Sequence, residues 1–351
     1  MKILFCDRKS DLRYGSHQNM ATLCDKLKNR GHRVSAVIES KNFFFEELTK
    51  MGIDVTVQPH SSFEDIPPVL RLLKNHNPDV IWMNNICPTY FSFLISKVLR
   101  IPVVLSLWTA DFGLTDNISV VLSDSVVVPS KHFLLSLPSA VRDKSYIVWN
   151  AVDTKKFSIK SRNKFRGRIR ERLGIPKDAI VVGAIIIYQK VIDPILEVIK
   201  RTEEEDLYFL IVSDRPDKLK SSIISKKVFF IEPMFHIEEV FSEFDIYLSL
   251  EFFKHSGRSI AEAMCMGIPT VASSSGISTE MIENGTTGFL YEHGNYASAA
   301  EKVRLLLHNK KARADIGLKS FKFAKERFCS EKNSNTVEKI LEKTIVSKRR
   351  K

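Results

Sequence analysis

The 351-residue sequence has no apolar run of the roughly 18–20 residues that a membrane-spanning helix needs. It opens MKILFCDRKS, with charges directly after a short apolar run, which is typical of a buried strand and unlike a signal peptide. Cysteines are also scarce. The five are odd in number, widely scattered and without a C-x-x-C pair, which argues against a disulfide framework or a zinc site. We therefore expect a cytoplasmic protein whose cysteines are small buried apolar residues, namely Cys6, Cys24, Cys87, Cys265 and Cys329.

Several motifs that define common enzyme classes are also missing. Neither half has G-x-G-x-x-G after its first strand, which argues against a nicotinamide-dependent dehydrogenase. There is no D-x-D and no cluster of carboxylates suited to Mg²⁺, so we expect neither a metal nor a cofactor. The histidines are single and unpatterned, and no serine–histidine or cysteine–histidine pair indicates a covalent intermediate.

Positive charge is abundant, and it is concentrated. The net charge is +12, and most of the excess lies in residues 155–172 and in the stretch from residue 301 to the final KRRK. Nucleic acid is a conceivable partner, but no recognition helix, zinc finger or aromatic RNA-binding motif accompanies the charge. An anionic membrane surface or an acidic ligand fits at least as well.

Short apolar runs alternate with amphipathic stretches along the chain, which predicts an α/β protein with doubly wound parallel sheets. One example of a predicted helix is the stretch 19–32, where Met20, Leu23, Cys24 and Leu27 form one apolar stripe and Gly31 follows as a C-cap. The rhythm breaks in the basic stretch and restarts near Ala179, so the length divides into two domains. We expect domains at 1–155 and 179–330, a basic linker at 156–178, and a final helix with a basic tail at 331–351.

The segment 245–275, DIYLSLEFFKHSGRSIAEAMCMGIPTVASSS, is the most informative part of the chain. A strand ending near Leu250, a loop with Gly257 and a helix beginning near Ser259 together present backbone N–H groups to a phosphate. Glu262, in the first turn of that helix, is placed to reach a ribose diol. The alternative is an ordinary turn and a carboxylate that interacts with the helix dipole, and the residues by themselves do not decide between the two.

This segment resembles the signature of the family-4 retaining glycosyltransferases, E-G-F-G-x-x-x-x-E-A-M-A-x-G-x-P-V-V. Three other stretches are similar to motifs of the same family: GISTEMIENGTTGFLYEHGN, IVWNAVDTKKF and YGSHQNMATLCDKLKNRGHRV. The similarity covers nearly the whole chain at compatible spacing. It implies the GT-B fold: two Rossmann-like domains facing a cleft, the first binding acceptor and the second binding a nucleotide sugar, with a C-terminal helix that crosses back to the first domain.

The resemblance also implies roles for particular residues. Glu262 would bind the nucleotide ribose, and the backbone N–H groups of Gly257, Arg258 and Ser259 would face the donor diphosphate. Lys190 would neutralise that diphosphate, although a solvated surface lysine is its alternative reading. Gly15 and Ser16 would form the first-domain loop beside the donor, and Asp111 keeps a familiar acidic position. The predicted catalytic residues are accordingly Lys190, Glu262 and Asp111.

Three positions depart from the family pattern. Lys254 stands where the family has its first glutamate, Ala184 lies near the place of an arginine, and Trp108 replaces a frequent histidine. Either Lys254 or Arg258 is a candidate to supply the cation that the arginine would have provided. Lys254 therefore joins the predicted donor-binding residues.

Together these features predict a metal-independent, retaining hexosyl- or N-acetylhexosaminyl-type glycosyltransferase. Its donor would be a UDP- or GDP-linked sugar, and its acceptor a saccharide or a lipid-linked molecule in glycan or surface-polysaccharide synthesis. We expect it in the cytoplasm, with peripheral attachment to the cytoplasmic face of a membrane as a further hypothesis. The alternative is a catalytically inactive GT-B protein that acts as a binding or partner subunit.

Overall fold

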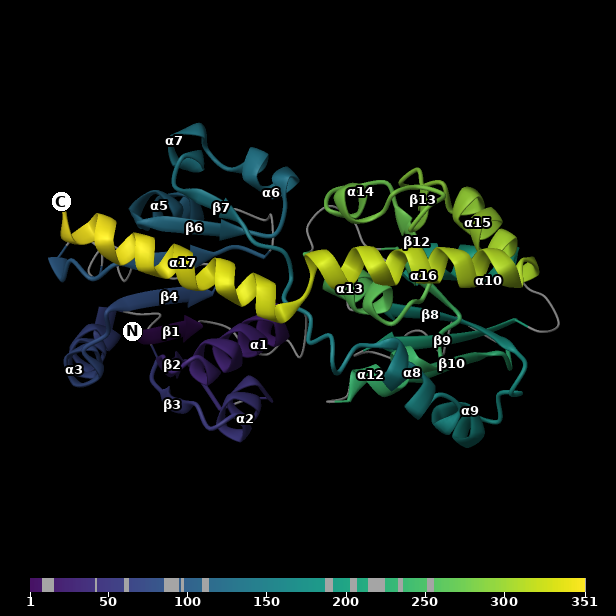
Figure 1. Ribbon diagram of the computed structural model, residues 1–351, viewed down its shortest axis with the longest axis horizontal. Coiled ribbons are helices and arrows are strands. Elements are labelled where there is room, and N and C mark those ends of the chain that lie inside the picture. The colour runs from purple at the N-terminus through teal and green to yellow at the C-terminus, as the bar shows by residue number, and fades with distance from the viewer. Residues whose placement is uncertain are drawn as a thin grey trace. The chain divides into compact units, whose positions relative to one another are not determined.

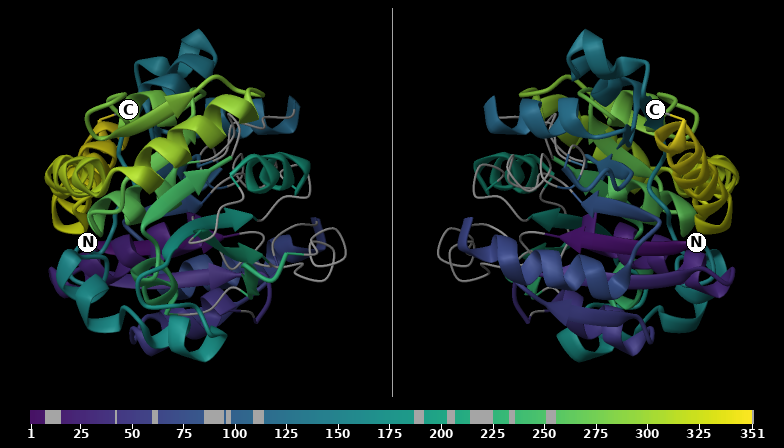
Figure 2. Two further views of the ribbon diagram at one scale, coloured as in Figure 1. Left: turned by 90° about the vertical axis from the view of Figure 1, so that its right-hand side faces the viewer. Right: turned by 90° about the vertical axis from the view of Figure 1, so that its left-hand side faces the viewer.

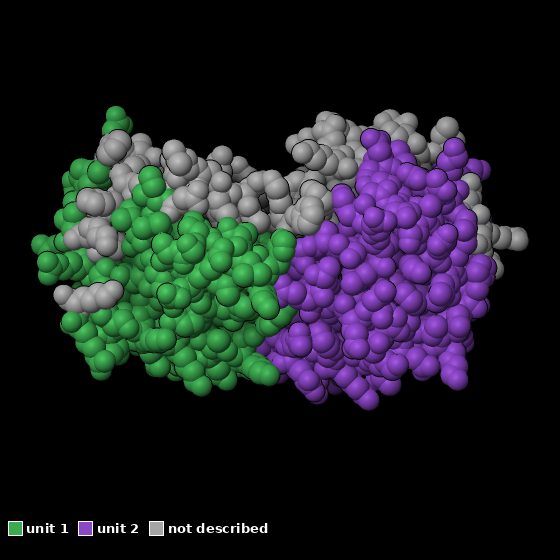
Figure 3. Space-filling model, turned by 90° about the horizontal axis from the view of Figure 1, so that it is seen from above, with its two compact units in different colours: residues 1–151, 330–351 green, residues 152–329 purple. Residues whose placement is uncertain are grey.

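The computed structural model describes residues 1–7, 16–41, 43–59, 63–84, 95, 98–108, 114–186, 192–202, 207–213, 225–232, 236–250 and 256–350. The chain divides into two compact units (Figure 3). Unit 1 comprises Met1–Ala151 and Ser330–Lys351, and unit 2 comprises Val152–Cys329. The chain thus leaves unit 1 once and returns to it for its last helix.

Unit 1 is built on a seven-stranded parallel sheet in the order β3-β2-β1-β4-β5-β6-β7 (Figure 1). Its strands are β1 (Lys2–Asp7), β2 (Arg33–Ile38), β3 (Asp54–Val57), β4 (Val80–Asn84), β5 (Val103–Ser106), β6 (Ser125–Val128) and β7 (Ser145–Ile147). Its helical elements are α1 (Ser16–Asn29), α2 (Phe43–Lys50), η1 (Phe63–Asp65), α3 (Ile66–His76), α5 (Leu114–Leu122), α6 (Lys131–Ser136), α7 (Ser139–Arg142) and α17 (Ser330–Arg349).

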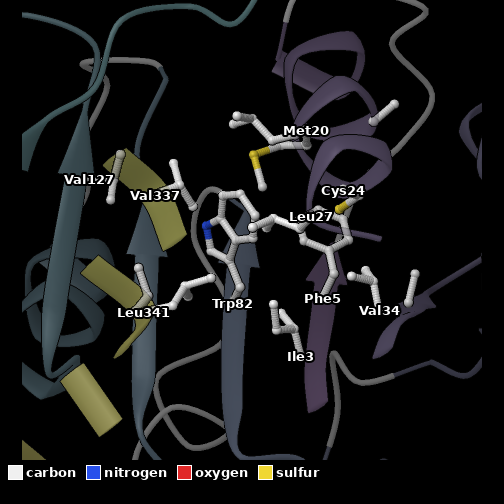
Figure 4. Packing of buried hydrophobic residues seen from close by; sticks show 14 of the residues in the cluster. Ile3, Phe5, Met20, Cys24, Leu27, Val34, Trp82, Val127, Val337 and Leu341 are labelled. Carbon is white, nitrogen blue, oxygen red and sulfur yellow. The ribbon is translucent and has the colours of Figure 1, made fainter. Parts of the chain in front are cut away.

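The sheet of unit 1 is buried on both faces because its strands alternate apolar side chains between two helical layers. Ile3 and Phe5 of β1 pack in one cluster with α1 and α17, whereas Leu4 and Cys6 pack in another with α3. Figure 2 (right view) shows α3 and α17 on opposite sides of these strands. Figure 4 shows Trp82 of β4 in the first of these clusters. This two-sided burial confirms the doubly wound arrangement predicted from the continuous apolar runs.

Helix α1 confirms the predicted amphipathic stripe and its glycine stop. Met20, Leu23, Cys24 and Leu27 are all fully buried. Gly31 has φ +85°, the left-handed conformation of a C-terminal cap, and its N–H donates to the carbonyl of Lys28 at 2.9 Å.

Helix α17 belongs to unit 1, which confirms the prediction that the C-terminal helix returns to the first domain. Its residues Val337 and Leu341 are fully buried in the α1-side cluster. Glu338 accepts a hydrogen bond from Arg30 at 2.8 Å and lies 2.6 Å from Nε2 of His32. These polar contacts of α17 lie beside its buried residues Val337 and Leu341. The His32 contact, together with Arg30, lowers the pKa of Glu338, although burial opposes the shift.

Unit 2 contains a six-stranded parallel sheet in the order β10-β9-β8-β11-β12-β13. Its strands are β8 (Ile180–Ile186), β9 (Leu207–Ser213), β10 (Val228–Ile231), β11 (Ile246–Ser249), β12 (Thr270–Ser273) and β13 (Gly288–Tyr291). Its helices are α8 (Ile159–Phe165), α9 (Arg168–Leu173), α10 (Ile192–Arg201), α12 (Ile237–Ser242), α13 (Arg258–Cys265), α14 (Ser278–Met281), α15 (Tyr296–His308) and α16 (Lys310–Arg327).

The basic stretch differs from the linker expected at residues 156–178, because it folds as part of unit 2. It forms α8 and α9, and Arg170 is only 2% exposed. The Arg170 guanidinium contacts Glu243 at 3.2 Å and Asp245 at 2.7 Å, two carboxylates that precede β11. Sequence analysis counted the charges but not their partners, which lie about 75 residues further along the chain.

No helix among the described residues is long and apolar enough to cross a membrane. The cysteines that the structure describes are free thiols, with Cys6, Cys24 and Cys265 buried and Cys329 partly exposed. Burial raises the pKa of the Cys24 and Cys265 thiols, which suits the predicted role as apolar packing groups. Cys87 lies outside the described residues.

Candidate functional site

The candidate site of unit 2 lies where α13 begins, after the carboxyl end of β11. Gly257 precedes the helix with φ +68°, a left-handed conformation that favours glycine. A Cβ atom at this position would lie 2.6 Å from the Sδ atom of Met281 and 3.0 Å from Cγ2 of Ile277. Both conformation and space therefore require glycine here.

The first turn of α13 contains backbone N–H groups that precede the first hydrogen bond of the helix. The first helical hydrogen bond runs from the N–H of Ala261 to the carbonyl of Gly257 at 3.1 Å, and Gly257 has no side chain to cap the helix. The N–H groups of Arg258 and Ser259 precede that bond, at the positive end of the helix dipole. This is the arrangement predicted for binding a diphosphate, and its assignment to one remains a proposal.

Glu262 is buried beside this helix start, with a side chain only 5% exposed. It lies just beyond the first turn predicted for it, because Gly257 is the cap and α13 begins at Arg258, one residue earlier than expected, which makes Glu262 the fifth residue of the helix. The Nε atom of Arg258 donates a hydrogen bond to Oε1 of Glu262 at 2.7 Å, and the Arg258 side chain is only 6% exposed. This pair was not predicted from the sequence.

Two further charged groups lie near Glu262. Burial raises the pKa of Glu262 above its ordinary value, Glu238 adds to the rise, and Arg258 and, more weakly, Lys156 oppose it. Lys156 is ion-paired with Oε2 of Glu238 at 3.2 Å, and His236 lies 3.2 Å from the other oxygen of Glu238. Sequence reasoning missed these residues because Lys156 was counted within a charge run and Glu238 belongs to no motif.

A second polar cluster lies in unit 1 at the carboxyl ends of β1 and β4, where the strand order reverses. Asp7 ends β1 and lies 2.8 Å from Nε2 of His17, in the first turn of α1. The amide of Asn84, at the end of β4, donates to the other oxygen of Asp7 at 3.2 Å. All three side chains are buried. Open α/β sheets bind ligands at this kind of reversal, yet the sequence analysis gave His17 no partner.

The remaining predicted residues are placed as follows. Gly15, Asp111, Lys190 and Lys254 lie outside the described residues. Ser16 begins α1, and its side chain is outside the description. The departures Trp108 and Ala184 are each 1% exposed and pack in the cores of units 1 and 2, respectively.

The fold and this site together define a class of protein. Two doubly wound parallel sheets, with the last helix returned to the first unit, form the GT-B fold. Residues 165–323 match the model of the family described as glycosyl transferases group 1, a range that includes α13 and Glu262. Over these residues the chain is similar to this family of glycosyltransferases.

Individual relatives are distant in sequence but close in fold. The chain is 22% identical over 347 residues to N-acetyl-alpha-D-glucosaminyl L-malate synthase of Bacillus anthracis, covering 90% of each chain. It is 24% identical over 228 residues to the O-antigen biosynthesis glycosyltransferase WclY of Escherichia coli, covering 62% of this chain and 61% of the relative. The crystal structure of HepE from Anabaena, in complex with UDP and glucose, superposes with a TM-score of 0.82 at 20% identity, covering 97% and 99% of the two chains.

Proposed function

We propose that the protein is a retaining glycosyltransferase that moves a sugar from a nucleotide-sugar donor to a saccharide or lipid-linked acceptor. The observation that carries this proposal is the buried carboxylate of Glu262 beside the start of α13, where the N-cap residue Gly257 has no side chain. An ionised carboxylate accepts hydrogen bonds from a ribose diol, and free N–H groups at a helix start bind a diphosphate. One short segment thus offers contacts to two consecutive parts of a nucleotide sugar.

The proposed reaction requires stabilisation of the negative charge on the leaving group. When the bond between the anomeric carbon and the phosphate oxygen breaks, negative charge develops on the nucleoside diphosphate. The N–H groups of Arg258 and Ser259 and the positive end of α13 are proposed to stabilise that charge, with Lys190 and Lys254 as further cations. The acceptor oxygen bonds to the anomeric carbon, and its proton passes to the departing phosphate oxygen. No metal or other cofactor enters this scheme.

The relatives support a hexosyl or N-acetylhexosaminyl donor. One curated relative carries N-acetylglucosaminyl transfer in its name, another acts in O-antigen biosynthesis, and HepE was crystallised with UDP and with UDP-glucose. We therefore propose a UDP-linked sugar first and a GDP-linked sugar second, in glycan or surface-polysaccharide synthesis.

A thermal-shift screen with UDP-, GDP-, ADP- and CMP-sugars tests the donor proposal. A ligand that binds only the folded protein at 100 times its Kd stabilises it by about 2.7 kcal/mol. For an unfolding unit of 150–250 residues, this corresponds to a rise in Tm of roughly 5–11 °C. We expect this rise with one nucleotide class, UDP before GDP. A protein whose Tm is unchanged by every nucleotide sugar at millimolar concentration would contradict the proposal.

The second candidate is an inactive GT-B protein that binds a nucleotide sugar or a partner without transferring sugar. Lys254, at the position of the family's first glutamate, favours this candidate. Donor consumption separates the two functions. Release of nucleoside diphosphate from the bound donor supports the transferase, whereas donor that stays intact with every saccharide acceptor supports the binding protein.

A peripheral association with an anionic membrane remains a proposal, but fewer residues of the basic stretch 155–172 are available for it than were first considered. Arg162 and Arg166 lie 3.7 and 2.6 Å from Asp245, and Arg170 is buried, so these charges are used within unit 2. The other exposed cations of residues 155–172 are Lys155, Lys160, Lys164, Arg168 and Arg172, of which Arg168 also lies 3.8 Å from Glu239. Co-sedimentation with anionic vesicles that fails to weaken at high salt would argue against this association.

A further inference from the structure

The contact between Arg258 and Glu262 is unusual for the place it occupies in the fold. Arg258 is the first residue of α13, and its Nε atom reaches Oε1 of Glu262 four residues later at 2.7 Å. The arginine side chain is 6% exposed and the glutamate side chain 5%, so both charges are withdrawn from water. A buried pair of this kind occurs here at the centre of the proposed donor site.

Stability alone does not account for this pair. A cation in the first turn opposes the helix dipole, at a cost of about 0.3–1 kcal/mol in exposed helices. The order of charges is also unfavourable, since an acid four residues before a base stabilises a helix better than the reverse. A buried ion pair is, moreover, often no more stabilising than apolar side chains of similar volume. Each consideration favours an apolar residue at position 258. The positive charge of Arg258 therefore has a role other than stabilising the helix.

We propose that Arg258 is a positioning residue that holds the carboxylate of Glu262 in its charged form, with its second oxygen turned to the ribose of the donor. This inference rests on the proposed function. It adds to that function the residue that keeps Glu262 able to accept hydrogen bonds from the ribose. Glu262 is the group that touches the nucleotide, and Arg258 acts through it.

The surroundings of Glu262 explain why it needs a close cation. Burial by itself favours the neutral acid, which has lost the charge that strengthens its hydrogen bonds to two hydroxyls. Lys156 helps from further away, but its ammonium is paired with Glu238, whose negative charge opposes ionisation. Within the described part of the chain, the buried thiol of Cys265 is a further titratable group near Glu262, and His236 acts on Glu238. Among the described residues, Arg258 is the side chain that donates directly to Glu262.

The test is a calorimetric titration of UDP into the full chain between pH 5.5 and 8.5. The proteins compared are the wild type, Arg258→Met, Arg258→Lys and Glu262→Gln. Loss of an opposite charge at this distance raises a carboxyl pKa by about 1–3 pH units. Because the charged form binds, the pH at which half the affinity remains should rise by the same amount in Arg258→Met. Below that pH the affinity should fall about tenfold for each pH unit.

Three comparisons separate this effect from a structural one. Arg258→Lys should retain most of the wild-type pH profile, since it restores a cation. Glu262→Gln should bind UDP weakly because it lacks the negative charge, and equally weakly at every pH because it has no carboxyl group to titrate. His236→Asn should keep the wild-type profile, which excludes the imidazole that contacts Glu238 as the source of the pH dependence.

An infrared measurement supplies a readout that does not depend on the nucleotide. The difference spectrum between Arg258→Met and Arg258→Met/Glu262→Gln at pH 6 should contain the band of a protonated carboxyl group. Absence of that band, or an Arg258→Met protein that binds UDP as the wild type does at pH 6, overturns the inference. A loss of affinity that is equal at pH 6 and pH 8.5 also overturns it. A wild-type protein that binds no nucleotide instead contradicts the proposed function, whatever the infrared result.

Discussion

Replacing Arg170 with methionine is expected to lower the free energy of unfolding of unit 2 by about 3–5 kcal/mol, because it leaves the buried carboxylate of Glu243 without its cation. The guanidinium donates to Glu243, to Asp245 and to the carbonyl of Ala179, the last two at 2.7 Å each. Glu243 is fully buried and also accepts from the N–H groups of Gly167 and Ile169, at 2.9 Å each. The loss of Arg170 therefore disturbs both the start of α9 and the residues that lead into β11.

Scanning calorimetry of the full chain measures this effect, with Arg172→Met as the matched control. Arg172 lies in the same helix but is exposed. For a unit of this size the expected fall in Tm is about 10 °C for Arg170→Met. The control should stay close to the wild type, within about 0.5 kcal/mol. Equal Tm values for the two variants would mean that the basic stretch is not anchored through Arg170.

Replacing Gly257 with alanine is expected to impair the donor site more than the same replacement at another glycine with a similar positive φ. An L-residue in the left-handed region costs about 1–2 kcal/mol. The new Cβ atom would also lie 2.6 Å from Sδ of Met281, a fully buried side chain with little room to move. The backbone at the start of α13 must then shift, and with it the N–H groups proposed to hold the diphosphate. We expect at least tenfold weaker nucleotide binding, an order-of-magnitude estimate based on misplaced hydrogen bonds.

Gly174→Ala is the control for this substitution. Gly174 has φ +70°, almost the same as Gly257, but no atom lies within 4 Å of a Cβ placed there. It should therefore lose stability through backbone strain alone and bind nucleotide as the wild type does. Similar nucleotide affinities for the two variants would show that the start of α13 has no part in binding.

The parallel direction and the location of most strands were predictable from the sequence, because parallel strands buried on both faces appear as continuous apolar runs. KILFC and VIWM are examples, and they form β1 and β4 side by side. The two-domain division followed from the interruption of this rhythm. The exact domain boundary was not predictable, because the basic residues that were expected to form a linker make ion pairs with carboxylates in α12 and before β11.

The candidate site was predictable where one stretch of chain contains it, and less so where distant residues meet. Gly257 and Glu262 were recognised from a single motif, with an error of one residue in the helix position of Glu262. The Arg258–Glu262 pair needs the conformation of Gly257, which sets where the helix begins. The contacts of Lys156 with Glu238 and of His17 with Asp7 need the tertiary fold, because no local spacing brings those residues together.

The most direct measurement of the central claim is the affinity of UDP, or of the nucleotide selected by the thermal-shift screen, for the wild type and for Glu262→Gln at pH 8. The substitution keeps the shape of the side chain but removes its charge and one acceptor oxygen. If Glu262 binds the ribose, the variant should lose about 1–3 kcal/mol of binding free energy, which is roughly 5- to 150-fold in Kd. Glu301→Gln, an exposed glutamate on α15 of the same unit, should bind as the wild type does. Equal affinity of the wild type and Glu262→Gln would contradict the placement of the nucleotide at α13.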